Sequence, residues 1–144
     1  MKKAAFICIV AIFTLYLVGC SKDDTSMDID KYKWQAATVQ NAKDGSITAC
    51  SSDYISQYED AEEISVELEA NKGNMTINDL SDNKKYSGTY DLIKTTPSGE
   101  IYEINVGDED GMATCSVTNE SGKETPTLII TLGEYSINFQ PDTE

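Results

Sequence analysis

The sequence predicts an all-β domain, an antiparallel up-and-down meander of about eight strands that closes into a small β-barrel. Two observations lead to this prediction. From Tyr32 onward, apolar and polar residues alternate with a period of two, as in strands with one buried face. The alternating runs recur about every eight to thirteen residues, so neighbouring strands should pair as hairpins without crossover helices. A closed barrel hides the apolar faces and leaves no free edge.

The predicted strands follow one another along the chain with little between them. Residues 34–40 supply the first strand, and residues 47–50 a shorter second one. Residues 53–62 are expected to form a short helix or an irregular loop. The clearest run is 64–70, which is apolar at every second position. The later strands are centred on residues 75–77, 90–92, 102–106, 113–117, 128–132 and 135–139.

Short polar segments separate these runs and carry turn residues. The predicted breaks are residues 71–73, 82–84, 97–99, 107–111, 119–122 and 133–134. Residues 107–111 place three acids between two glycines, which could wrap a Ca²⁺ ion, but they lack the ligand order of a calcium loop and are read as a turn. A second acidic cluster could likewise be a Ca²⁺ site or an ordinary turn, and it consists of Glu59, Asp60, Glu62 and Glu63.

An immunoglobulin-like sandwich is the competing fold, and it would place a Trp between two disulfide cysteines. Trp34 precedes Cys50 instead, which favours the barrel.

The first nineteen residues have the layout of an export signal. Lys2 and Lys3 precede an almost unbroken apolar run that is short for a membrane span. Leu17-Val18-Gly19-Cys20 resembles the lipobox of bacterial lipoproteins. The resemblance implies cleavage before Cys20 and acylation of this cysteine, and several acyl chains hold a protein stably on a membrane. We therefore predict a lipoprotein signal peptide over residues 1–19, a lipid tether over 20–30 and the barrel domain over 31–144.

Charge and missing residue types exclude several functions. The chain has 11 Lys and no Arg against 25 acidic residues, and without the leader nine Lys remain, a formal charge of −16. A surface this acidic does not bind nucleic acid, and its membrane attachment must come from the lipid. The chain has no His, which removes Ser-His and Cys-His nucleophiles and the commonest transition-metal ligand. We expect no catalytic residue, no metal and no cofactor.

Two cysteines remain once Cys8 leaves with the leader and Cys20 carries lipid. Cys50 and Cys115 are an even pair in a protein outside the cytosol, so a disulfide between them is allowed. It would close a loop of some 65 residues and contribute about 3–4 kcal/mol. The alternative is two separate thiols packed as small core residues.

The chain resembles the lipocalin-like lipoprotein domains of Bacteroidetes over roughly residues 32–140. The resemblance rests on Lys33-Trp34-Gln35 in the first strand, on Ser87-Gly88-Thr89-Tyr90-Asp91, and on the closing hairpin 128–139. Lys22-Asp23-Asp24 also resembles the acidic export signal of surface lipoproteins in this group, and an ordinary hydrophilic tether is the alternative. Both resemblances imply an outer-membrane location. Tyr32 stands where lipocalins carry Gly, and their late Arg is missing, so no ligand-site residue carries over.

Aromatic side chains are the candidate ligand contacts. Trp34, Tyr54, Tyr58 and Tyr90 could line the barrel mouth and stack on a neutral apolar or sugar-like ligand. The favoured alternative is that the Tyr residues lie at strand ends, with their rings in the core and their hydroxyls in water. Tyr54 and Tyr58 would share a face if their segment were helical. We expect a non-catalytic barrel that binds a small ligand or a protein partner. The alternative is an accessory subunit of an outer-membrane assembly, with Trp34, Tyr90, Leu128 and Phe139 filling the barrel.

Overall fold

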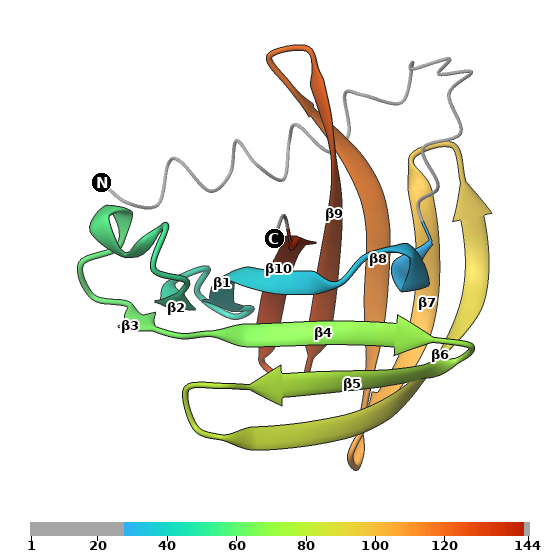
Figure 1. Ribbon diagram of the computed structural model, residues 1–144, viewed down its shortest axis with the longest axis horizontal. Coiled ribbons are helices and arrows are strands. Elements are labelled where there is room, and N and C mark those ends of the chain that lie inside the picture. Colours follow the sequence, from blue (N-terminus) through green and yellow to red (C-terminus); the bar gives the residue numbers. More distant parts are fainter. Residues whose placement is uncertain (1–27, 143–144) are drawn as a thin grey trace.

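The computed structural model describes residues 28–142, and these residues form a closed eight-stranded antiparallel β-barrel (Figure 1). The strands are β1 (Trp34–Asn41), β2 (Ile47–Cys50), β3 (Glu62–Glu63), β4 (Val66–Asn71), β5 (Asn74–Asp79), β6 (Lys84–Thr96), β7 (Gly99–Val106), β8 (Glu109–Glu120), β9 (Lys123–Leu132) and β10 (Tyr135–Pro141). Two 3₁₀ turns, η1 (Ile29–Lys31) and η2 (Ile55–Gln57), accompany them. The predicted fold class is confirmed.

The barrel wall follows the order β1, β4, β5, β6, β7, β8, β9, β10, and β10 closes it by pairing with β1. This last pairing runs from Trp34 opposite Pro141 to Asn41 opposite Tyr135. Every pairing in the wall is antiparallel. Figure 1 shows β4 and β5 running across the view, β6 curving upward on the right and β7 to β10 standing nearly upright, as expected for one strongly twisted and closed sheet.

Strand β2 departs from the predicted meander. It forms where a shorter second strand is expected, but it does not belong to the barrel wall. The edge of β1 that faces β4 pairs with β4 only at Trp34 and Gln35, and the later residues of the same edge pair with β2. Strand β3 then joins β2 in parallel. The segment between β1 and β4 is thus a flap beside the wall.

Tight turns connect the wall strands where glycine and polar residues predict them. In the turn 72–73, Lys72 and Gly73 have φ angles of 49° and 83°, the left-handed values that a two-residue hairpin turn needs at both positions. The break predicted over residues 107–111 is shorter in the structure. Residues 107–108 make the turn, and Glu109, Asp110 and Gly111 already belong to β8. The acidic segment considered as a Ca²⁺ loop is therefore mostly strand.

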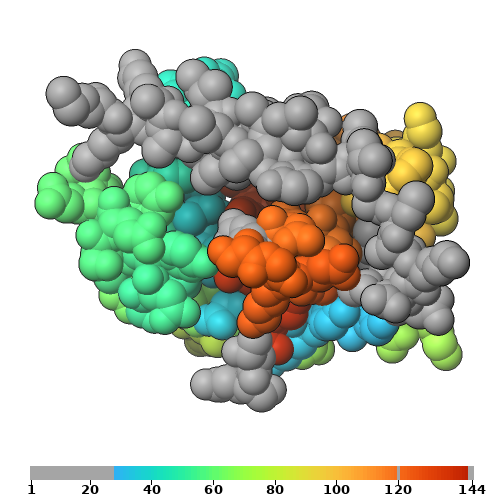
Figure 2. All heavy atoms as spheres, turned by 90° about the horizontal axis from the view of Figure 1, so that it is seen from above, coloured from blue at the N-terminus to red at the C-terminus, as the bar shows by residue number. Residues whose placement is uncertain are grey.

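The two ends of the barrel differ. The turns 72–73, 97–98 and 121–122 share one end with η1 and with the end of β10, and we call this the tether end. Figures 1 and 2 both show the yellow tip of the β6–β7 hairpin and the orange tip of the β8–β9 hairpin on the same side of the molecule. The turns 80–83, 107–108 and 133–134 lie at the opposite end, the far end. Ile29 is only 1% exposed, so the packed domain includes residues before the predicted boundary at residue 31.

One apolar core fills the interior. Most predicted inner phases are the buried ones, with Leu68 on β4, Ile104 on β7 and Ile130 on β9 each at most 1% exposed. The prediction is wrong at Leu92, beside the bulge of β6, and at Tyr135, the first residue of β10, which are 54% and 47% exposed. The core contains Ile29, Trp34, Ala36, Leu68, Ala70, Met75, Ile77, Tyr90, Tyr102, Ile104, Val106, Ala113, Cys115, Leu128, Ile130 and Phe139. The stability of the domain therefore rests on burial inside the barrel.

Candidate functional site

Trp34 lies in the packed core and not at an open mouth. Its side chain is 0% exposed, and its indole Nε1 donates a hydrogen bond to the backbone oxygen of Ile29 at 2.8 Å. The ring of Tyr32 meets it edge-on, with centroids 5.4 Å apart. This arrangement satisfies the only polar atom of the indole and ties η1 to the tether end of the barrel. In this structure Trp34 offers no free face to a ligand.

Tyr90 is also part of the core. It is 9% exposed and makes an edge-to-face contact with Tyr102, with ring centroids 5.6 Å apart. Leu128 and Phe139 are both 0% exposed. The four side chains predicted to fill an accessory barrel are therefore all buried in one core.

Tyr54 and Tyr58 lie on the flap, outside the core that contains Trp34 and Tyr90. The segment predicted as a short helix or loop contains only the single 3₁₀ turn η2 between them, so they do not share the face of a helix. The Tyr54 hydroxyl donates to Oε1 of Gln140 at 3.2 Å, which fastens the flap to β10. Both side chains are half-buried. The structure thus separates the four candidate aromatics into two core residues and two flap residues.

Cys50 and Cys115 are free thiols, so the disulfide considered from the sequence is absent. They lie on strands that are not neighbours, since β2 pairs with β1 and β3 while β8 pairs with β7 and β9. Cys115 points into the core, and burial raises its pKa to about 12. Burial also raises the pKa of Cys50, which is 0% exposed and lies opposite Thr38 on β2, within the flap. Each thiol packs as a small apolar residue.

A polar cluster closes the tether end. The Tyr102 hydroxyl donates to the carboxylate of Glu100 and accepts the backbone N–H of Ile29 at 3.4 Å. Burial raises the pKa of Glu100, and the neighbouring carboxyl of Asp28 raises it further, while the hydrogen bond from Tyr102 lowers it. The pKa of Tyr102 is raised by burial and by this bond. The cluster holds η1 against β7 and so has a structural role.

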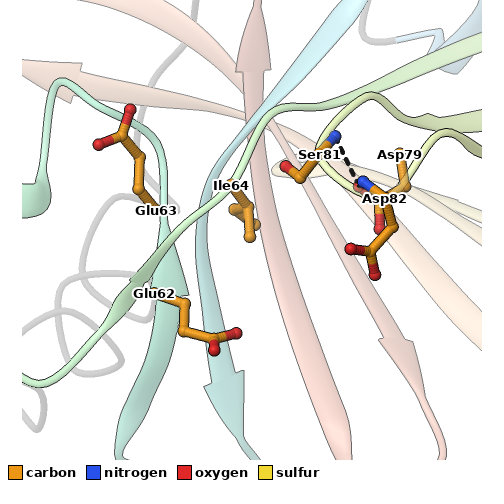
Figure 3. Close-up of a pocket in the computed structure, with 6 residues that line it drawn as sticks. All are labelled: Glu62, Glu63, Ile64, Asp79, Ser81 and Asp82. Atoms are coloured by element: carbon orange, nitrogen blue, oxygen red, sulfur yellow. Dashed lines mark hydrogen bonds between the residues drawn. The ribbon is translucent and has the colours of Figure 1, made fainter.

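A surface hollow of about 380 Å³ lies at the far end, beside the turn 80–83 (Figure 3). Its lining residues are Glu62, Glu63, Ile64, Asp79, Ser81 and Asp82. Oδ1 of Asp79 accepts the backbone N–H groups of Ser81 and Asp82 at 3.0 and 3.1 Å. Lys84 pairs with Asp82 at 3.6 Å. These bonds shape the turn, and the hollow has no enclosed polar group that would bind a ligand.

Two kinds of feature are missing from residues 28–142: a cluster of metal-ligating side chains and a long apolar helix. Within this range, no group of three His, Cys, Asp or Glu residues could hold a metal ion. Oδ1 of Asp110, one of the acids expected in a calcium loop, accepts a hydrogen bond from Nδ2 of Asn105 at 2.8 Å. Nor does the same range contain a helix long and apolar enough to cross a membrane. Cys20, the predicted lipidation site, lies outside the described residues.

The alternation reading missed one set of surface residues. It assigned the inner face of each strand and left the outer face polar, yet Ile101, Met112 and Ile129 point outward. The signal was present in the sequence, because Ile101 directly precedes the inward Tyr102, and Ile129 stands between Leu128 and Ile130.

Comparison of the chain with protein-family models, with curated proteins and with solved structures gives no match.

Proposed function

We propose that this chain is a lipid-anchored protein of a bacterial outer membrane, and that its barrel is a non-catalytic scaffold that binds a protein partner on its outside. The observation that carries this proposal is the filled interior. Trp34, Leu128 and Phe139 are each 0% exposed in a single core, with Tyr90 beside them at 9%. An eight-stranded barrel is just wide enough to be filled by side chains or to hold one small ligand, and these side chains occupy the space. The accessory role therefore fits better than an interior ligand.

The anchor part of the proposal rests on Cys20. Between Cys20 and Asp28, the first described residue, eight peptide steps span at most about 29 Å. Asp28 precedes η1 at the tether end, so lipid on Cys20 would keep that end near the bilayer and leave the far end and the outer wall accessible. The chain has no His and no Arg, so the commonest general base and the side chain that binds phosphate in a bidentate way are both missing, which supports a non-catalytic role.

The Cys20→Ala variant tests the anchor. We expect it to lose acyl-chain labelling and either leave the membrane or remain an uncleaved precursor, because the thiol is the acceptor of the lipid. Cys50→Ala is the matched control and should be labelled as wild type. Labelling of Cys20→Ala equal to that of wild type would refute the lipid anchor.

Native mass spectrometry of the protein extracted from its own membrane tests the filled barrel. The expected masses are the acylated chain alone or together with polypeptide subunits. A small molecule retained at one per chain would overturn the proposal and favour an interior ligand. As a control for detection, Phe139→Ala should open an apolar cavity and bind benzene, while wild type should not, because engineered apolar cavities take up such ligands. Trp34 fluorescence reports binding in both proteins.

A further inference from the structure

Three apolar side chains form a stripe on the outer wall of the barrel, where the alternation should place polar residues. Their partners in the strand pairing show the direction in which they point. Ile101 on β7 and Ile129 on β9 both lie opposite Thr114 on β8, and Met112 lies two residues before Thr114. The next residues along each strand are the core residues Tyr102, Ala113 and Ile130, which are 4%, 0% and 0% exposed. Because successive side chains in a strand point to opposite faces, the stripe faces outward.

The stripe is continuous across neighbouring strands. Met112 is diagonal to both isoleucines across the β7–β8 and β8–β9 pairings, a separation that long side chains bridge. Ile93 extends the stripe onto β6, because it is the extra residue of the bulge beside Lys94, which lies opposite Ile101. Met112 is 50% exposed and Ile93 is 56% exposed. We call Ile93, Ile101, Met112 and Ile129 the outer stripe.

Carboxylates border the outer stripe toward the far end. Glu103 lies directly opposite Met112, and Asp91 lies opposite Glu103, so all three share the outer face. Asp110, two residues before Met112, lies on this face too. The side chains of Asp91, Glu103 and Asp110 are exposed. An apolar strip with an acidic border attracts a surface of opposite charge and repels one of like charge.

We infer that the outer stripe docks a partner polypeptide whose contacting segment carries apolar side chains flanked by Lys or Arg. The apolar side chains would cover the stripe, and the basic ones would meet Asp91, Glu103 and Asp110. A second copy of this chain would bring the same acidic border near itself, against a formal charge of −14 on each full chain. An anionic lipid surface would be repelled for the same reason. This inference rests on the proposed partner-binding function and names the surface and the partner chemistry.

Site-specific photocrosslinking of the full-length chain, in cells that produce and lipidate it, tests the inference. A photoreactive amino acid at position 112 should yield an adduct whose crosslinked peptide carries apolar and basic residues. The same group at Glu69, an exposed position on β4, should yield none. With the photoreactive group at 112, the double variant Asp91→Lys, Glu103→Lys should reduce the adduct about tenfold or more. Asp53→Lys with Glu69→Lys makes the same charge change elsewhere and should leave the adduct unchanged.

The remaining outcomes overturn the inference in distinguishable ways. An adduct of dimer mass would assign the stripe to a second copy, and an adduct with lipid would assign it to the bilayer. If position 112 gives no adduct while a photoreactive group at Leu80 or Tyr86, at the far end, gives one, the partner binds elsewhere on the barrel. The inference about the outer stripe would then be wrong, and the proposed partner-binding function would stand. No adduct from any of these positions would count against both proposals. Circular dichroism of each purified variant checks that the barrel is folded.

Discussion

Replacing Phe139 with alanine measures how tightly the interior of the barrel is packed. Phe139 lies on β10, opposite Ala36 on β1 and Leu128 on β9, and all three side chains are at most 1% exposed. Removing a fully buried phenyl ring costs about 3–5 kcal/mol through lost burial and the cavity left behind. A domain of this size has a free energy of unfolding of roughly 6–17 kcal/mol. We therefore expect a folded variant whose melting temperature is about 12–20 °C lower.

Urea unfolding followed by Trp34 fluorescence is the assay. The chain has one Trp, and it is 0% exposed, so its emission should shift to longer wavelength on unfolding. With an m value of about 1.5 kcal/mol/M, the midpoint should fall by about 2–3 M. Far-UV circular dichroism provides a second probe that does not depend on Trp34. It is needed because Phe139 lies opposite Ala36, two residues from Trp34 on β1, so the substitution could change the Trp34 emission directly. Thr131→Ala, on the exposed face of β9, should stay within about 0.5 kcal/mol of wild type. A loss below about 1 kcal/mol for Phe139→Ala would refute the filled interior.

Three further predictions follow from single contacts. Burial raises the pKa of Glu100 in the folded state, so its contribution to stability is present below the unfolded pKa of about 4.3 and is lost as pH rises through the folded pKa. Glu100→Gln should flatten this dependence in unfolding curves measured from about pH 3.5 to 8, and a pH dependence of the unfolding free energy equal to that of wild type would contradict the prediction. Cys50 and Cys115 should react with a thiol reagent at pH 8 only after urea unfolding, and fast labelling of the native protein would argue against their burial. Gly88→Val should lower stability by roughly 1–3 kcal/mol, because a Cβ there would stand 2.3 Å from the backbone oxygen of Asn105, whereas a melting point equal to that of wild type would show that β7 can shift.

Much of the fold was predictable because the alternation of apolar and polar residues within one strand shows which of its faces is buried. In β4 the alternation of Leu68 and Ala70 with Glu67 and Glu69 identifies the inner face without knowledge of any neighbour. Turn residues mark the hairpins in the same local way, as Lys72 and Gly73 do. Trp34 and Tyr90 could be recognised as inward residues for this reason. Whether they line a cavity or fill the core depends on what packs against them, so the ligand role assigned to them could not be decided from the pattern.

The sequence by itself determined the all-β class, the hairpin turns and the inner phase of most strands, since these follow from alternation and turn chemistry within a few residues. It did not determine the number of wall strands, because the run 47–50 forms β2 outside the wall. Only the tertiary structure decided which strands meet. The closure of β1 on β10 joins residues about a hundred positions apart, and β1 shares one edge between β2 and β4. The order of the strands also keeps Cys50 and Cys115 apart, and it brings together Ile101, Met112 and Ile129 on the outer wall. Strand pairing and closure are long-range events, and local periodicity carries no information about the partner that a strand will meet.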